Sequence, residues 1–220
     1  AFEGINSQWS ISRPKLCCDV LQLDGALDKS YSSHLLASKT LPIRFQVMHS
    51  IRSASPVGSS QITLPVARGF SRLRGMFISM YHDGAGTKFT NTFYSPMLGL
   101  DNIDVNDNFE FHVTIGSQRF PDFSVDSTQE AFMRLWNAKL ILTGNDSISI
   151  TPAGYKNNKF ITALSFEKAA SATSHSGINT RSGSQLTFHC RQTNAATTIH
   201  LLLLYDCVAD IGLSGTVALD

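Results

Sequence analysis

The sequence carries little charge and lacks any long apolar run. No apolar stretch approaches the ~20 residues that a membrane-spanning helix needs, and no signal-peptide pattern is present. The sequence therefore predicts no transmembrane segment. Charged residues make up 16% of the 220-residue chain, against roughly 25% in typical soluble domains. This low value favours a surface that a partner covers in part, although a β protein rich in Ser and Thr would have a similar composition.

Cysteine is scarce, and its spacing gives little support to a metal site. No C-x-x-C pair occurs, so the ligand spacing typical of structural zinc is missing. Neighbouring residues of a strand point to opposite faces, so Cys17 and Cys18 are poorly placed to bridge each other. Cys190 and Cys207 lie in apolar contexts. We expect buried free thiols in a reducing compartment rather than a disulfide framework.

The motifs of common enzymes are also missing. No serine lies in a G-x-S-x-G elbow, and the seven histidines include no pair spaced i, i+2 or i, i+4. His112, His189 and His200 fall on predicted strands and could converge in the fold, but ordinary strand histidines are the simpler interpretation. We therefore predict that the chain is not an enzyme and that it holds no cofactor and no metal ion.

Two polar segments superficially resemble ligand-binding loops. Residues 83–88 (DGAGTK) lack the spacing of a phosphate loop, which needs G-x-x-x-x-G-K-[ST] between a strand and a helix. Residues 101–108 (DNIDVNDN) are rich in the oxygen ligands that calcium prefers. The glycine and the terminal glutamate of an EF-hand loop are missing, so an Asx-rich turn is the simpler interpretation. We expect both segments to form surface turns.

The net charge of +1 argues against nucleic-acid binding as the main function. The charge is nevertheless unevenly divided along the chain. Residues 1–100 carry ten Lys or Arg against five Asp or Glu, which gives +5. Residues 101–220 carry eight against twelve, which gives −4. The two halves could meet within one fold or between copies of it, and the sequence leaves both arrangements open.

Alternation of apolar and polar residues predicts an all-β fold. In residues 108–115 the pattern places Phe111 and Val113 on the inner face and His112 on the outer face. The longest apolar run, TTIHLLLLYDCVAD at 197–210, predicts a buried strand that completes the core. Gly75 suggests a bulge in its strand. The other segments expected to be extended are 9–23 (at a sheet edge), 42–51, 61–66, 70–81, 148–150, 160–166 and 185–191.

Two helices are expected as connections between these strands. Residues 26–39 have helical apolar spacing. Ser127 and Glu130 form a capping box, in which each side chain binds the other residue's backbone N–H. The apolar stripe expected on that second helix consists of Phe132, Leu135, Trp136 and Leu140.

The number and spacing of these elements predict a jelly-roll β-sandwich. About eight or nine strands, with long loops at 82–100 and 169–184, fit a Greek-key sandwich better than an up-and-down barrel. We expect one jelly-roll domain over residues 1–220. Residues 1–41 would form an N-terminal strand and a short helix, and residues 42–220 would form the barrel body.

Several segments, taken in order, resemble one protein family. The segments are WSISRPKLCCDV (9–20), LDGAL (23–27) with Tyr31, LPIRF (41–45), RFPDFSVDSTQEAF (119–132), GINTRSG (177–183) and the terminal run at 199–210. They are similar to the second, C-terminal jelly roll of double-jelly-roll major capsid proteins of Polinton (Maverick)-like and related large DNA virus lineages. Such proteins are normally about twice this length, and this chain begins with Ala1 rather than Met. We therefore expect it to be the C-terminal half of a longer capsid protein, whose first barrel is missing from this sequence or lies on another chain.

The resemblance implies a structural virion protein without enzymatic activity. Three subunits would form a pseudo-hexameric capsomer, and capsomers would tile an icosahedral shell assembled in the host cytoplasm or nucleus. The implied partners are further copies of the chain, neighbouring capsomers, and penton and minor capsid proteins, with no direct contact to nucleic acid. The residues expected at subunit contacts lie on the two long loops: His82, Asp83, Lys88, Tyr94, Asn179 and Arg181.

A carbohydrate- or receptor-binding jelly-roll module, such as a fibre head or a lectin-like domain, is the alternative function. Such a site needs aromatic side chains beside polar groups at the tip of a loop. Phe89, Phe93 and Tyr94 lie close in sequence to Asn91 and could provide one. A metalloenzyme on the same fold would need clustered histidines, which the sequence does not contain.

Overall fold

A computed structural model of the chain describes residues 10–20, 22–54, 61–82, 110–141, 150–151, 154–155, 159–167, 177–191, 197–214 and 217–219. The chain divides into two compact units. One consists of Ala1–Ile43 with Ala209–Leu219, and the other of Arg44–Val208 with Asp220. The second unit contains most of the core.

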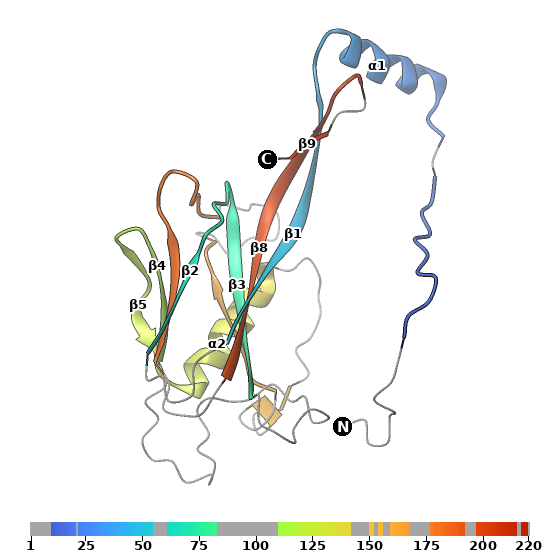
Figure 1. The fold of residues 1–220 in the computed structure, drawn as a ribbon. Helices are drawn as coiled ribbons and strands as arrows, with labels where there is room; N and C mark the ends of the chain where they lie inside the picture. Colours follow the sequence, from blue (N-terminus) through green and yellow to red (C-terminus); the bar gives the residue numbers. More distant parts are fainter. Residues whose placement is uncertain are drawn as a thin grey trace. The chain divides into compact units, whose positions relative to one another are not determined.

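Nine strands and two α-helices make up the described chain (Figure 1). The strands are β1 (Leu41–Ala54), β2 (Gln61–Val66), β3 (Leu73–His82), β4 (Glu110–Ile115), β5 (Gln118–Val125), β6 (Ile161–Ser165), β7 (Leu186–Arg191), β8 (Thr197–Ile211) and β9 (Val217–Leu219). The helices are α1 (Gly25–Leu36) and α2 (Thr128–Ala138), and the short 3₁₀ helix η1 (Lys139–Ile141) follows α2.

The strand order is that of a jelly roll. One sheet has the order β1-β8-β3-β6, with β9 paired to β8, and the other has the order β2-β7-β4-β5. Successive strands alternate between the two sheets, except at the β4–β5 and β8–β9 hairpins. Two sheets whose strands interleave in this way, each built on a four-stranded path, define the double-sheet jelly roll. The prediction of an all-β jelly-roll sandwich with short connecting helices is therefore confirmed.

The second sheet has one apolar and one polar face, as period-2 alternation requires. The pairing β2–β7–β4 aligns Ile62, Cys190 and Phe111 in one row across three strands. All three residues are buried, and Phe111 and Phe188 contact each other at 6.2 Å between ring centroids. The alternation predicted for β4 is confirmed, because the residues of the strand are alternately half-buried and buried.

The central strand of the first sheet is buried on both faces. All described side chains of β3 are buried. Helix α2 packs on the neighbouring strand β6, and η1 contacts β3 at Gly75. The close approach of η1 requires Gly75, where a Cβ atom would lie 2.7 Å from Ile141 Cδ1. Strand β8 pairs with β3 from Leu73↔Tyr205 to His82↔Thr197. The prediction that the terminal run is a buried strand is thus confirmed.

Helix α2 begins at the predicted cap but presents a different apolar stripe. The Ser127 hydroxyl accepts a hydrogen bond from the Glu130 N–H at 3.2 Å, which confirms that half of the capping box. The Glu130 carboxylate accepts from Arg134 at 2.7 Å. The buried residues of the helix are Ala131, Leu135 and Ala138, and Trp136 remains 41% exposed. The predicted stripe is therefore confirmed at Leu135, and Phe132 packs partly buried against the core, but the prediction was wrong for Trp136. It also missed Ala131 and Ala138, whose small side chains face the core; at β6, Thr162 Oγ1 donates to the Ala131 carbonyl at 3.1 Å.

Three further expectations differ from the structure. Strand β5 was not predicted, because Pro121 and Asp122 disfavour a strand. Its place at the end of the sheet order leaves one edge without a ladder partner, which tolerates Pro. In contrast, residues 10–20 and 22–24 form no strand, so the edge segment predicted there is wrong within the described residues. Of the strand expected at 148–150, only residue 150 is described, and it lies outside any strand.

The cysteines also separate into two groups. Cys190 and Cys207 are buried, as predicted, whereas Cys17 and Cys18 are exposed. The expectation of burial was wrong for this pair because residues 10–20 pack against no described part of the chain closely enough to be covered.

The first unit contains α1, β9 and the end of β8. None of the α1 residues is buried. Strand β9 pairs with β8 from Ala209↔Leu219 to Ile211↔Val217. The Thr40 hydroxyl donates to Asp210 Oδ1 at 3.3 Å, which links the segment after α1 to the same strand.

Candidate subunit-contact surface

The structure describes three of the six residues predicted at subunit contacts. His82 is the last residue of β3, and Asp83, Lys88 and Tyr94 lie outside the described residues, as does most of the 82–100 loop. The aromatic residues of the alternative carbohydrate-binding site also lie outside the described residues. Asn179 and Arg181 are both exposed on a loop formed by residues 177–183. Of the three predicted contact residues that the structure describes, Asn179 and Arg181 therefore lie together on one loop.

The 177–183 loop is held against the start of β3 by backbone hydrogen bonds. Leu73 and Ile178 exchange two of them, each 2.8 Å long. Thr180 N–H donates to the Phe70 carbonyl at 2.8 Å, and the Phe70 N–H donates to the Thr180 hydroxyl at 2.8 Å. These four hydrogen bonds, made by Ile178 and Thr180, fix the path of the loop backbone. The exposed side chain of Asn179, between them, is therefore attached to a rigid backbone.

A β-bulge places a buried arginine behind this loop. The β3–β8 register shifts between Leu73 and Gly75, so Arg74 is the extra residue of the bulge. Its side chain is fully buried, and its Nε donates to Glu167 Oε1 at 2.9 Å. Its Nη1 lies 3.7 Å from Asp206 Oδ1 on β8. The predicted irregularity near Gly75 is therefore confirmed, and it re-aims an arginine toward two carboxylates.

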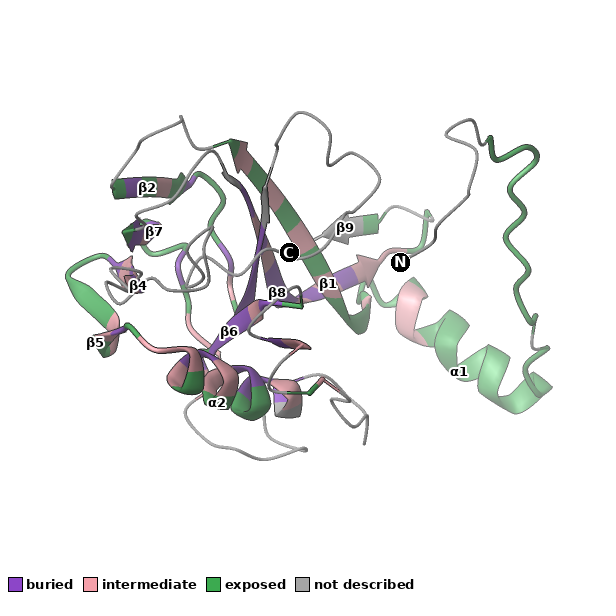
Figure 2. Ribbon diagram, turned by 90° about the horizontal axis from the view of Figure 1, so that it is seen from below, coloured by how far each residue is buried: buried purple, intermediate pink, exposed green. Residues whose placement is uncertain are grey.

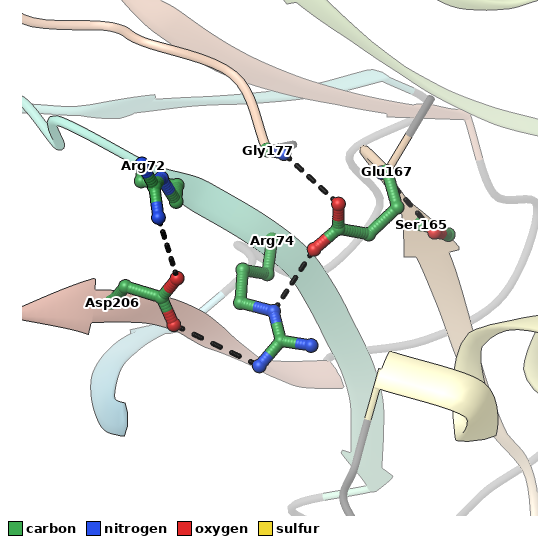
Figure 3. Close-up of polar contacts among 6 residues, drawn as sticks. All are labelled: Arg72, Arg74, Ser165, Glu167, Gly177 and Asp206. Atoms are coloured by element: carbon green, nitrogen blue, oxygen red, sulfur yellow. Dashed lines mark hydrogen bonds and ion pairs between the residues drawn. The ribbon is translucent and has the colours of Figure 1, made fainter. Parts of the chain in front are cut away.

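The second oxygen of Glu167 connects this ion pair to the loop. Glu167 Oε2 accepts from the Gly177 N–H at 3.0 Å, and the Glu167 N–H donates to the Ser165 hydroxyl at 3.3 Å (Figure 3). On the other side, Arg72 Nη1 lies 3.6 Å from Asp206 Oδ2. A chain of charged contacts therefore runs from β8 through β3 to the first residue of the loop.

Gly177 is required at this junction by both conformation and space. Its φ of +54° lies in the left-handed region, which glycine adopts most readily. A Cβ atom there would lie 2.6 Å from Arg72 Cγ and 2.9 Å from the Leu73 carbonyl. The sequence contains a signal for this arrangement: two arginines lie in the apolar segment FSRLRGMF. Arginines in a buried strand need carboxylates nearby, and this requirement could have predicted the ion pairs.

The tip of the loop presents its polar side chains outward. Asn179 Oδ1 accepts a hydrogen bond from the Arg181 N–H at 2.9 Å, which is the geometry of an Asx turn. Arg68, in the connection between β2 and β3, is also exposed. The surface at this position is therefore basic and polar, and suits contacts with an anionic partner.

The outer face of the second sheet forms a separate polar surface. The register aligns Thr63, His189 and His112 in one row across β2, β7 and β4. The two imidazole rings stack at 4.8 Å between centroids. His189 contacts the hydroxyls of Thr63 at 3.4 Å and Thr114 at 3.0 Å. Two of the predicted strand histidines thus converge, although ordinary strand positions were the favoured interpretation.

Burial and the neighbouring charges shift the pKa of His112. Burial first, and then the positive charges of Arg119 and His189, lower the pKa of His112 below its usual value, and Glu110 opposes the shift. Arg119 also donates to the Ser124 hydroxyl, which lies 3.3 Å from His112 Nδ1. The pair lies on one wall of a shallow depression of about 130 Å³ between β2, β7 and β4.

Within the described residues, no group of three or more His, Cys, Asp or Glu side chains could hold a metal ion. No described helix has both the length and the apolar character that crossing a membrane requires. The described surfaces consist of charged side chains, hydrogen-bonding groups and exposed apolar side chains.

Comparison with known proteins returns capsid structures and no sequence relative. No protein-family model matches the sequence, and no curated protein matches it. PBCV-1 VP54, as fitted into a cryo-EM reconstruction of the virophage Sputnik, is similar over 90% of this chain and 54% of that chain, with 12% identity and a TM-score of 0.48. The Sputnik virophage structure aligns over 83% and 38%, with 9% identity and a TM-score of 0.42. The mavirus major capsid protein aligns over 83% and 41%, with 10% identity and a TM-score of 0.38.

The chain therefore spans about half the length of these solved chains, or less. The fold itself is established by the strand order and the pairing within this chain.

Proposed function

We propose that this chain is a structural subunit of a viral capsid and forms the C-terminal jelly roll of a double-jelly-roll major capsid protein. Two independent features support the proposal. The ordered sequence segments resemble that family, and the chain has the strand order of a jelly roll. The observation that carries it furthest is the amount of apolar side chain that the single chain leaves exposed.

This exposed apolar area is concentrated in residues 10–36. Ile11 is 75% exposed, and Leu16 and Val20 are each 91% exposed. Helix α1 continues the pattern with Leu27, Tyr31 and Leu36, and it is drawn largely as exposed in Figure 2. Burying one large apolar side chain contributes about 1.5–3 kcal/mol. A run of such side chains in water is unfavourable for a protein that acts alone, so we infer that neighbouring parts of the shell cover them.

Under this proposal, three copies form a capsomer of pseudo-hexameric outline, and capsomers tile an icosahedral shell in the virion. Penton and minor capsid proteins would be further partners. The jelly roll supplies a stiff body, because its core is continuous across both sheets. Contacts that are modest in each copy are multiplied by symmetry. The 177–183 loop and residues 82–100 would lie at subunit contacts or on the outer surface.

Assembly of the purified protein tests this proposal. We expect sedimentation to detect trimers or larger species, and negative-stain electron microscopy to detect capsomers or shells. Replacing both Leu16 and Val20 by Glu should abolish assembly, since it places two charges in the area to be buried. The matched control replaces Ser10 and Ser12 by Glu, which adds the same charge to the same exposed segment and should leave assembly intact.

Two results would contradict the capsid proposal. One is a protein that remains monomeric at all concentrations while binding specific glycans on an array, which would favour the carbohydrate-binding alternative. The other is assembly that is equally sensitive to both double variants, because the loss would then reflect charge rather than apolar burial.

A further inference from the structure

A groove opens where the β2–β7 pair ends. The last ladder pair of these strands is Val66↔Leu186, and the chains meet again at the backbone bonds between Phe70 and Thr180. Between these two pairings, residues 67–69 and 181–185 separate and frame an open groove of about 470 Å³. Both sides of the frame are main chain outside any strand.

The side chains that line this groove are basic or neutral. Arg68 lies on one side and Arg181 on the other, and the polar groups between them include Thr180, Ser184 and Gln185. No Asp or Glu is among the described residues that line it. Both arginines are exposed, so an anion that enters the groove comes near two positively charged side chains and near hydroxyl or amide groups. This chemistry favours an anion, and above all a carboxylate, which a guanidinium can bind through two parallel hydrogen bonds.

Several contacts hold the groove in shape before any partner binds. The guanidinium of Arg68 lies 5.0 Å from the ring centroid of Tyr205 and 5.7 Å from that of Phe70, which restricts its rotamers. A Cβ at Gly69 would lie 3.2 Å from both Cα and Cγ of Arg181, so glycine permits the two walls to approach. The Gly116 N–H donates to the Gln185 carbonyl at 3.1 Å and braces the far side. Such preorganisation reduces the entropy lost on binding.

We propose that this groove binds an acidic polypeptide segment, whose carboxylates pair with Arg68 and Arg181. Main-chain groups on both sides suit an extended peptide, which can hydrogen-bond to backbone as well as to side chains. Nucleic acid fits less well, because its affinity depends on neutralising many phosphates and this chain carries a net charge of only +1. In the capsid the segment would come from a neighbouring subunit, and that part of the inference rests on the proposed function.

Fluorescence anisotropy with the purified protein tests the groove directly. The probes are a labelled hexapeptide of alternating Asp and Gly, a Lys-Gly hexapeptide, and a twelve-nucleotide single-stranded DNA. We expect the protein to bind the acidic peptide in preference to both other probes. Arg68→Gln and Arg181→Gln should each weaken that binding about tenfold or more, the loss expected for one charge-assisted contact. The double variant should abolish it.

Two controls separate the groove from general charge effects. Arg44→Gln removes an exposed arginine from β1 and should leave peptide binding unchanged. Gly69→Ala keeps every charge but narrows the groove, so it should weaken binding while the protein stays folded by circular dichroism. Binding that survives the double variant, or DNA bound more tightly than the acidic peptide, would overturn the inference.

The outcome is independent of the capsid proposal. If the acidic peptide binds through both arginines and no trimers or shells form, the groove stands and the capsid function fails. If shells form and the double variant neither binds the peptide less tightly nor assembles less well, the capsid function stands and the groove fails.

Discussion

The ion pair between Arg74 and Glu167 provides a sharp quantitative test of the fold. Glu167→Gln keeps the shape of the side chain and removes its charge, while Arg74 remains fully buried. Removing one partner of a buried pair typically costs about 3–5 kcal/mol. Asp206 still lies 3.7 Å from the Arg74 guanidinium and is only partly buried. We therefore expect the free energy of unfolding to fall by about 3 kcal/mol, at the lower end of this range.

Urea denaturation of both the wild-type protein and the variant measures this difference. The midpoint should fall while the slope with denaturant stays the same, because the area exposed on unfolding is unchanged. Glu110→Gln is the matched control, since Glu110 makes an exposed pair with Arg191 at 3.8 Å. Exposed pairs contribute about 0–1 kcal/mol, so this identical chemical change should have little effect.

The same variant should loosen the 177–183 loop selectively. Glu167 Oε2 accepts the Gly177 N–H, and a neutral amide is a weaker acceptor. Hydrogen exchange at the amides of Ile178 and Thr180 should therefore accelerate more than exchange in β7. Replacing both Arg74 and Glu167 by Met should restore much of the stability, as apolar replacements of buried ion pairs often do. A Glu167→Gln loss no larger than that of Glu110→Gln would refute the reasoning.

Substitutions at three further positions test other parts of the structure. The pKa of His112 is lowered in the folded state, so the unfolded chain binds the proton more tightly. The contribution of His112 to stability should therefore be full above pH 6.5 and decline as the pH falls below it. His112→Asn should flatten that decline in unfolding curves measured across this pH range, and an unchanged slope would contradict the assignment. Gly75→Ala should lower the free energy of unfolding by about 1–3 kcal/mol, because the new Cβ would lie 2.7 Å from Ile141 Cδ1. Thermal unfolding measures this loss, and a neutral effect would show that η1 can move away. Ser127→Ala should cost about 1 kcal/mol through loss of the α2 cap, whereas Ser127→Asp should retain most of the stability.

Local patterns predicted most of the fold because they act over a few residues. Strand β2 has the predicted bounds, and β4 has the predicted inward and outward faces. The cap of α2 followed from Ser127 and Glu130 alone. Strand β5 was missed because its Pro121 disfavours pairing, and only its position at a sheet edge makes that proline acceptable.

The candidate sites depended on contacts between residues far apart in the sequence. Arg74 lies 93 residues from Glu167, and its direction results from a bulge in the register of β3 against β8. His112 and His189 stack because β4 and β7 are neighbours in a particular register. No spacing rule links such residues, since the order of strands in a jelly roll separates sequence neighbours and joins distant segments.

The sequence by itself determined the β class, the helix cap, the buried terminal strand and the family resemblance, because alternation and capping are set by local backbone geometry. Only the tertiary structure decided which side chains meet. It formed the groove between Arg68 and Arg181 and buried Arg74. It also left Ile11, Leu16 and Val20 exposed, contrary to the edge strand expected there. Burial and charge pairing arise from the packing of distant segments, and the periodicity of any one segment carries no information about its neighbours in space.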